Sequence, residues 1–151
     1  TEVFFLEDRL VEAFERITAN NEQVDALLAR ADAVLAFEEI SLSYLTKVER
    51  LSPFGMQNPK PVFLMRDICV REISRFGKGG EHLKLKIDSL PAGRQGTKSI
   101  DAVTFFVKGP IARVVQTLTR GSRANLLVHL ERDSFSRSNP VRLRLLNIKP
   151  V

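Results

Sequence analysis

Apolar and polar positions follow two different periodicities along this chain, and the change falls close to Pro61. Over residues 3–19, apolar side chains recur at spacings of three and four positions, which predicts an amphipathic helix. A second apolar stripe follows Ser41, whose hydroxyl is well suited to cap a helix. We expect this helix to end at Ser52, because a residue that precedes proline is pushed out of the helical region of the backbone.

Beyond Pro61, apolar residues alternate with polar ones, which is the period of a half-buried strand. The alternation is cleanest over residues 82–87 and slips near Arg66 and Asp67, which predicts a bulge or bend in the first strand. The predicted elements are, in order, a strand at 62–74, a turn at 78–80, a strand at 82–87, a loop at 91–99, a strand at 100–107, a short helix from Pro110 to Gly121, a strand at 124–132, a polar turn at 133–139 and a strand at 141–148.

Five strands with one short helix between the third and the fourth is the element order of an OB-fold barrel. An SH3-like barrel is the alternative, but it normally lacks a helix of this length at that place. Residues 52–61 contain three prolines, a glycine and Asn58, which together predict a rigid connector. The predicted fold class is mainly β, with a five-stranded OB-fold barrel at residues 62–151 and an α-helical segment within residues 1–51.

The charge distribution divides the chain at the same connector. The 151 residues carry a net charge of +5, but residues 1–60 hold 6 basic and 11 acidic side chains, whereas residues 61–151 hold 17 basic and 7 acidic ones. The barrel half therefore carries the whole basic excess. An excess of this size indicates a polyanionic partner.

Composition excludes several classes of protein. A hydrophobic content of 44% is too high for a disordered chain, and no apolar run approaches the roughly 18–20 residues of a membrane helix. No signal-peptide pattern opens the chain. One cysteine, Cys69, cannot form an internal disulfide, so we expect a cytoplasmic protein with no membrane partner. Because the chain opens on Thr1 rather than methionine, we also expect a fragment of a longer protein.

Four stretches resemble the RecJ family of single-stranded-DNA-specific exonucleases. They are Leu51–Phe63 (family pattern L-x-P-F-G-x-G-N-P-x-P-x-F), Phe76–Leu85 (G-x-x-x-x-H-L-K-L), Asp101–Phe105 (D-A-I-A-F) and Arg142–Ile148 (L-Q-L-x-I-x-D-I). Gln57 departs from the first pattern, where the family usually has glycine. The resemblance covers roughly residues 30–150, in matching order and spacing.

The resemblance implies a larger enzyme that degrades single-stranded DNA from 5′ to 3′ in recombination and repair. In this family an upstream DHH domain holds manganese or magnesium, and a following DHHA1 domain carries a Gly-Gly-His motif; neither motif occurs here. Residues 1–51 would then be the helical tail of a truncated α/β domain of the DHHA1 type, residues 52–61 the connector, and residues 62–151 the OB domain. We expect no catalytic residue, metal site or cofactor in this chain itself.

Binding of single-stranded DNA is the activity expected of the barrel, with basic side chains meeting phosphates and aromatic rings stacking on bases. Phe76 and Phe135, predicted at strand ends, are the stacking candidates. The basic candidates occupy outward strand positions or loops: Lys78, Lys84, Lys86, Arg94, Arg132, Arg137, Arg142 and Arg144. A solvated barrel surface is the alternative for about half of these cations, and core packing is the alternative for each phenylalanine.

Three other phenylalanines and the two histidines are interpreted as structural residues. We expect at least two of Phe63, Phe105 and Phe106 in the core, and we interpret His82 and His129 as packed or polar strand residues rather than metal ligands. Two further functions stay open. One is that the barrel docks a protein partner, such as a single-stranded-DNA-binding protein with an acidic tail, and touches DNA little. The other is that the fragment retains some nuclease activity, which we do not expect.

Overall fold

The computed structural model describes residues 26–27, 29–89 and 98–151. The predicted helix at residues 3–19 and most of the predicted loop at 91–99, including Arg94, lie outside these ranges. The elements are, in order, β1 (Ala33–Val34), the 3-10 turn η1 (Phe37–Glu39), α2 (Leu42–Glu49), β2 (Phe63–Phe76), β3 (His82–Asp88), β4 (Ile100–Thr104), α3 (Gly109–Thr117), β5 (Arg123–Arg132) and β6 (Val141–Pro150).

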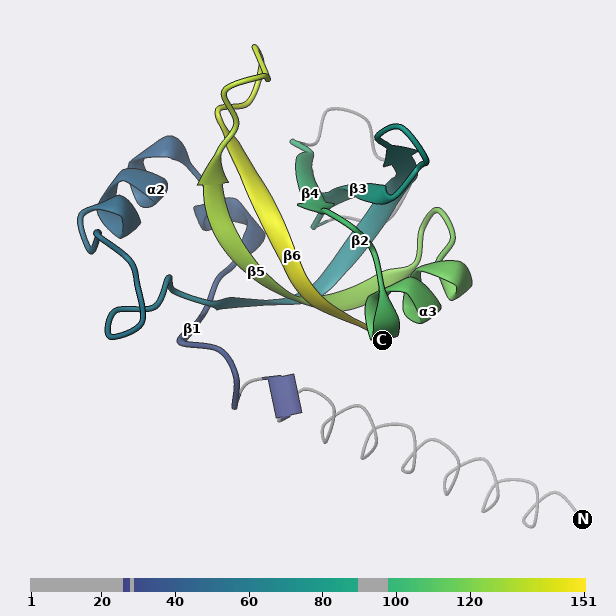
Figure 1. The fold of residues 1–151 in the computed structure, drawn as a ribbon, viewed down its shortest axis with the longest axis horizontal. Helices are drawn as coiled ribbons and strands as arrows, with labels where there is room; N and C mark the ends of the chain where they lie inside the picture. Colours follow the sequence, from purple (N-terminus) through teal and green to yellow (C-terminus); the bar gives the residue numbers. More distant parts are fainter. Residues whose placement is uncertain (1–25, 28, 90–97) are drawn as a thin grey trace, which may run out of the picture.

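Strands β2 to β6 close into a barrel, with α2 and α3 on opposite sides of it (Figure 1). The strands follow the order β2-β3-β4-β6-β5, and β5 returns to pair with β2. All neighbours are antiparallel except β4 and β6, which run parallel. This topology, with α3 between the third and fourth barrel strands, confirms the predicted OB-fold and removes the SH3-like alternative.

Alternating side chains build the barrel interior as the sequence predicted. Leu83, Leu85 and Ile87 of β3 are fully buried, and inward residues of the other four barrel strands join them in one apolar cluster. Burial of each such side chain contributes roughly 1.5–3 kcal/mol. Pro110 lies in the first turn of α3, where its missing N–H is not needed, and Val115 of this helix packs into the same cluster.

A bulge bends β2 where the alternation slipped. The pairing of β2 with β5 shifts between Met65 and Ile68, and Asp67 has a φ of 52°. The Asp67 carboxylate accepts a hydrogen bond of 2.6 Å from Arg123 Nε, which lowers the pKa of that carboxyl, and Asn125 Oδ1 accepts from the Asp67 N–H at 2.8 Å. The predicted bulge is therefore confirmed, and polar contacts to β5 hold it in place.

The segment before the connector packs against the barrel. Ser41 Oγ caps α2 by accepting from the Tyr44 N–H at 3.1 Å, as predicted, and β1 pairs in parallel with the start of β2. Buried side chains of this segment belong to the same cluster as the barrel interior: Leu35, Phe37, Ile40, Leu45 and Val48. The assignment of residues 1–51 to an upstream domain stays a prediction, but residues 33–49 share the core of the barrel.

Predicted boundaries differ from the structure by three or more residues in three elements, and by one or two residues in several others. The helix after Ser41 ends at Glu49, α3 ends at Thr117 rather than Gly121, and β4 ends at Thr104 rather than residue 107. In the connector, Asn58 Nδ2 donates to the carbonyl oxygens of Leu51 and Pro53 at 2.7 and 2.9 Å. The connector is therefore hydrogen-bonded to the end of α2, as its turn-forming composition suggested.

Candidate nucleic-acid interface

The outer face of β3, β4 and β6 forms one continuous surface. Because side chains alternate along β3, Lys84 and Lys86 point outward, opposite Val103 and Asp101 of β4. The β2–β3 turn (residues 77–81) borders this face at one end. At the other end the β5–β6 loop (residues 133–140) approaches it, where Lys86, Asp101, Asp133, Ser136 and Asn139 line a polar pocket of about 140 Å³. In OB-folds this face and these two loops bind oligonucleotides.

Four aromatic rings gather beside the β2–β3 turn. His82 lies at the centre, with ring centroids 5.1 Å from Phe76, 5.0 Å from Phe105 and 4.7 Å from Phe106. Phe76 also meets Phe105 edge to face at 5.8 Å. Phe76 is 37% exposed and Phe106 64% exposed, so the cluster presents apolar rings to solvent.

Two arginines of β6 adjoin this cluster. The guanidinium carbon of Arg144 lies 4.3 Å from the centre of the Phe105 ring, and that of Arg142 lies 6.0 Å away. Both distances fall within the range of cation–π attraction. We call this set the aromatic–arginine surface: Phe76, His82, Phe105, Phe106, Arg142 and Arg144.

A single carboxylate orients the two arginines. Glu131 of β5 accepts from Arg144 Nε at 3.1 Å and Arg142 Nε at 3.3 Å, and its carboxylate lies 3.5 Å from Lys60 Nζ. Burial raises the pKa of Glu131, but the hydrogen bond from Arg144 and the charges of Arg144, Lys60 and Arg142 outweigh burial, so the pKa lies below its ordinary value. One negative charge thus faces three positive charges, which leaves this part of the surface cationic.

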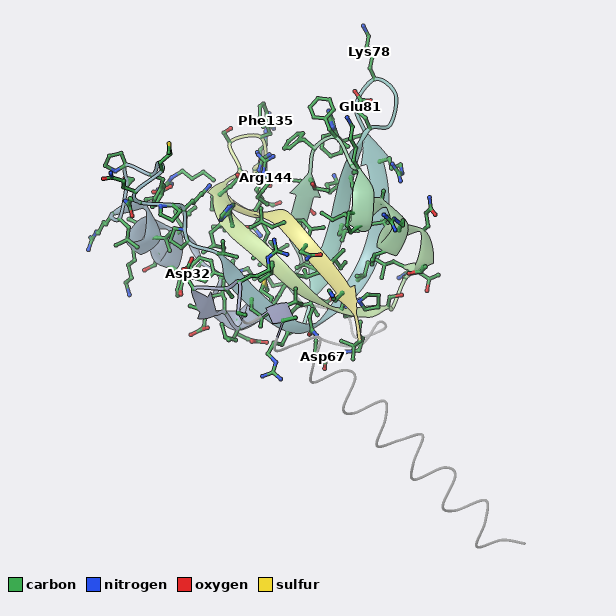
Figure 2. The ribbon with its side chains drawn as sticks, turned by 60° about the horizontal axis from the view of Figure 1, so that its bottom comes forward. Asp32, Asp67, Lys78, Glu81, Phe135 and Arg144 are labelled. Atoms are coloured by element: carbon green, nitrogen blue, oxygen red, sulfur yellow. The ribbon has the colours of Figure 1, made fainter. Side chains whose placement is uncertain are left out.

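The other predicted cations differ in whether they have an ion-pair partner. Lys86 lies 3.8 Å from Glu72, and both side chains are well exposed. Lys78 is exposed at the tip of the β2–β3 turn, and Arg137 and the 89% exposed Phe135 belong to the β5–β6 loop. In Figure 2, Lys78 and Phe135 lie toward the top of the view, Arg144 lies below Phe135, and Asp67 lies at the bottom. Lys84 has no ion pair within the part of the chain that the structure describes.

Arg132 points away from this surface. Its Nε and Nη2 donate to the two carboxylate oxygens of Glu49 on α2, at 2.8 and 2.7 Å. The hydrogen bond with Arg132 lowers the pKa of Glu49 and raises that of Arg132. The side chain therefore ties β5 to α2.

Sequence reasoning missed three members of the surface. The expectation that at least two of Phe63, Phe105 and Phe106 are core residues is wrong, because only Phe63 is buried; Phe105 is half-buried and Phe106 exposed. Phe105 and Phe106 follow the last residue of β4, so the alternation of a strand does not apply to them. His82 is packed, as predicted, but among exposed rings. His129 Nδ1 lies 2.8 Å from the Pro61 carbonyl oxygen, as suits a structural strand histidine.

The described residues contain no cluster of three histidine, cysteine or carboxylate side chains that could hold a metal ion. Across the same part of the chain, no helix is long and apolar enough to span a membrane. Cys69 is buried and free. The chemistry that the geometry supports is recognition by rings and cations.

Comparison with known proteins gives one family match and several more distant similarities. The model of the RecJ OB domain family matches residues 31–147. The single-stranded-DNA-specific exonuclease RecJ of Bacillus subtilis is 29% identical over 96 residues, which are 64% of this chain and 11% of that protein. This chain therefore corresponds to a small part of its curated relative.

Two solved structures are distantly similar to this chain. An OBody bound to hen egg-white lysozyme has a TM-score of 0.48 at 15% identity and covers 60% of this chain and 81% of its own. The second single-stranded-DNA-binding protein of Mycobacterium smegmatis has a TM-score of 0.43 at 20% identity, with 59% and 86% covered. Both TM-scores are below 0.5, so the fold assignment rests on the strand order described above.

Proposed function

The chain belongs to the RecJ OB domain family, and from this membership we propose that its barrel is the single-stranded-DNA-binding part of a larger exonuclease. The observation that carries the proposal is the aromatic–arginine surface on the outer face of β3, β4 and β6. Exposed rings beside cations are what unpaired nucleotides require, because each base offers a flat face and each phosphate a negative charge. Bases within a duplex are already stacked and cannot reach such rings.

Recognition of this kind is independent of sequence. Arg142 and Arg144 are held by Glu131 rather than directed by a shaped pocket. Cations that meet phosphates fix the position of the strand but do not read its bases. The basic excess of the barrel half supports the same function, since it concentrates a polyanion near the surface.

The activity of the larger enzyme is inferred from the family and from the name of the B. subtilis relative. Hydrolysis 5′ to 3′ in DNA recombination and repair would take place in an upstream DHH domain that holds manganese or magnesium. The barrel would help to close the groove through which the strand reaches that domain, in the cytoplasm. A manganese-supplemented digest of an end-labelled oligonucleotide by this chain alone should therefore show no shortening.

Fluorescence anisotropy with a labelled oligo(dT) tests the binding proposal. We expect binding at low salt that weakens steeply as salt increases. The double variant Arg142→Ala/Arg144→Ala should reduce the slope of log K against log salt by about 1.4, because each phosphate contact on a single strand contributes about 0.7. Arg66→Ala is the control for the loss of one positive charge elsewhere: Arg66 is exposed and precedes Asp67 in the sequence, and Asp67 lies far from Arg144 in Figure 2, so this variant should leave the slope unchanged.

Two results would overturn the proposal. One is an absence of oligo(dT) binding at low salt together with binding of an acidic peptide, which would indicate a protein-docking barrel. The other is a change of slope in Arg66→Ala that is half as large as the change in the double variant, since that variant removes two charges and Arg66→Ala removes one; the charges would then act through the net charge of the chain and not through this surface.

A further inference from the structure

Phe106 combines an unusual backbone with an unusual exposure. Its φ of 52° lies in the left-handed region, which residues other than glycine rarely adopt, and its side chain is 64% exposed. Exposure of an apolar phenylalanine ring to water is unfavourable. A strained backbone persists only where the surrounding structure enforces it. Both features are common where a chain presents a side chain to a ligand.

The start of β3 enforces this conformation. The Phe106 N–H donates to His82 Nδ1 at 3.1 Å, and the N–H of the next residue, Val107, donates to the Glu81 carbonyl oxygen at 2.8 Å. The same His82 ring contacts the Phe106 ring at 4.7 Å, with the two planes at 87°. His82 therefore holds both the backbone and the side chain of Phe106. Because Nδ1 accepts a hydrogen bond, the proton of the neutral imidazole is on Nε2.

Gly77 makes room for the His82 ring. Its φ is 90°, and a Cβ atom at this position would lie 2.7 Å from His82 Cδ2 and 3.1 Å from Nε2. Any other residue would push the ring away from the turn. The β2–β3 turn, the start of β3 and the segment after β4 thus form one support, with Phe106 as its most exposed ring.

We propose that Phe106 is a stacking platform for one unpaired nucleobase at the turn end of the aromatic–arginine surface, and that His82 is the positioning residue that fixes it there. The inference rests on the proposed function and deepens it. Arg144 and Arg142, beside the neighbouring Phe105, would meet the phosphates that flank the stacked base. Since every base has a flat face, the platform favours a base over its absence and does not select among the four.

Two oligonucleotides with the same phosphates separate stacking from charge. One is a labelled oligo(dT), and the other carries abasic tetrahydrofuran units in place of every base. With the full chain, Phe106→Ala should weaken oligo(dT) binding by roughly 5- to 140-fold, the equivalent of one stacked base, and leave binding of the abasic strand unchanged. Phe106→Trp should retain the preference for bases. Val34→Ala, which trims an exposed apolar side chain on β1, is the matched control and should change neither affinity.

The role of His82 is tested by the ratio of two dissociation constants, that for the abasic strand divided by that for oligo(dT). His82→Leu keeps an apolar side chain but has no acceptor for the Phe106 N–H, so the ratio of the two dissociation constants should fall toward that of Phe106→Ala. His82→Asn can place its Oδ1 near the position of Nδ1 and should restore part of the preference. Measurements well below the melting temperature of each variant separate this effect from unfolding, because a purely structural role would lower the melting temperature and leave the ratio intact.

The outcomes distinguish this inference from the proposed function. If the wild-type chain binds oligo(dT) and Phe106→Ala binds it equally well, the platform is refuted and the DNA-binding function stands. An equal loss on the abasic strand also refutes it, because Phe106 would then act through the charges. If the wild-type chain binds neither strand at low salt, the proposed function itself fails.

Discussion

Replacing Glu131 by glutamine removes one negative charge from a point where three positive charges meet. Glutamine has nearly the same shape, and its carbonyl oxygen still accepts a hydrogen bond, so the substitution changes charge more than packing. Without the carboxylate, Lys60, Arg142 and Arg144 repel one another with no anion among them. We therefore expect Glu131→Gln to destabilise the folded chain.

The size of the effect follows from how exposed these groups are. The Glu131 side chain is 17% exposed, and its three partners are 21–33% exposed. Fully exposed ion pairs contribute up to about 1 kcal/mol, and loss of one partner from a buried pair costs about 3–5 kcal/mol. For this half-buried network we expect a loss of about 1–2 kcal/mol at pH 7, or roughly 2–8 °C in melting temperature.

The loss should depend on pH in a defined direction. The network lowers the pKa of Glu131 in the folded state, so its contribution is complete above the ordinary glutamate pKa of about 4.3 and disappears as the pH falls through the lowered value. The assay is urea denaturation of the wild type and Glu131→Gln at pH 7 and at the lowest pH where both fold. The difference in unfolding free energy should be present at pH 7 and shrink in acid.

Glu72→Gln provides the control, because Glu72 is 62% exposed and its contact with Lys86 is 3.8 Å. We expect it to cost less than about 0.5 kcal/mol. The reasoning is refuted if Glu131→Gln is no less stable than the wild type at pH 7, or if the difference between the two is the same in acid.

Three further outcomes follow from the packing. Leu85→Ala should lower the unfolding free energy by about 2–5 kcal/mol in urea denaturation, since Leu85 is fully buried; a loss below 1 kcal/mol would contradict its place in the core. Cys69, 1% exposed, should resist a thiol reagent in the native chain and react once urea unfolds it, and rapid native labelling would show that β2 opens locally. A chain reduced to residues 62–151 loses Leu35, Phe37 and their neighbours from the core, so its circular dichroism should lack a cooperative melt; a sharp melt would instead support a domain boundary at the connector.

The barrel strands could be predicted because the pattern of apolar and polar residues within each strand agrees with its orientation in the barrel. In β3 each inward residue is apolar and each outward one polar until Asp88, so the period alone gives both the element and its orientation. In α3, Pro110 marks the first turn in the same local way. The bulge at Asp67 was also visible, since a single extra residue breaks the alternation. None of these predictions needed a partner from elsewhere in the chain.

The missed features all depend on distant partners. β4 ends at Thr104, and beyond it the N–H groups of Phe106 and Val107 bond to His82 and Glu81, more than twenty positions earlier, which no local pattern shows. Arg132 follows the buried Leu130 by two positions and so lies on the inner side of β5, and only its distant partner Glu49 on α2 shows that it is ion-paired. Sequence patterns thus placed the cations on the right strands but did not show which of them have partners.

Closure of the barrel has a consequence for how the chain reaches its native state. Strands β2, β3 and β4 pair with near neighbours in sequence, whereas β2 pairs with β5, and β4 with β6, only after long loops close. Such topologies fold in milliseconds to seconds. During synthesis at roughly 5–20 residues per second, the β4 edge of the early three-stranded sheet would stay unpaired for roughly 2–9 s until β6 emerges, whereas the β2 edge can pair as soon as β5 emerges. The nascent chain is therefore most prone to aggregation in that interval, and a chaperone that covers strand edges should act there.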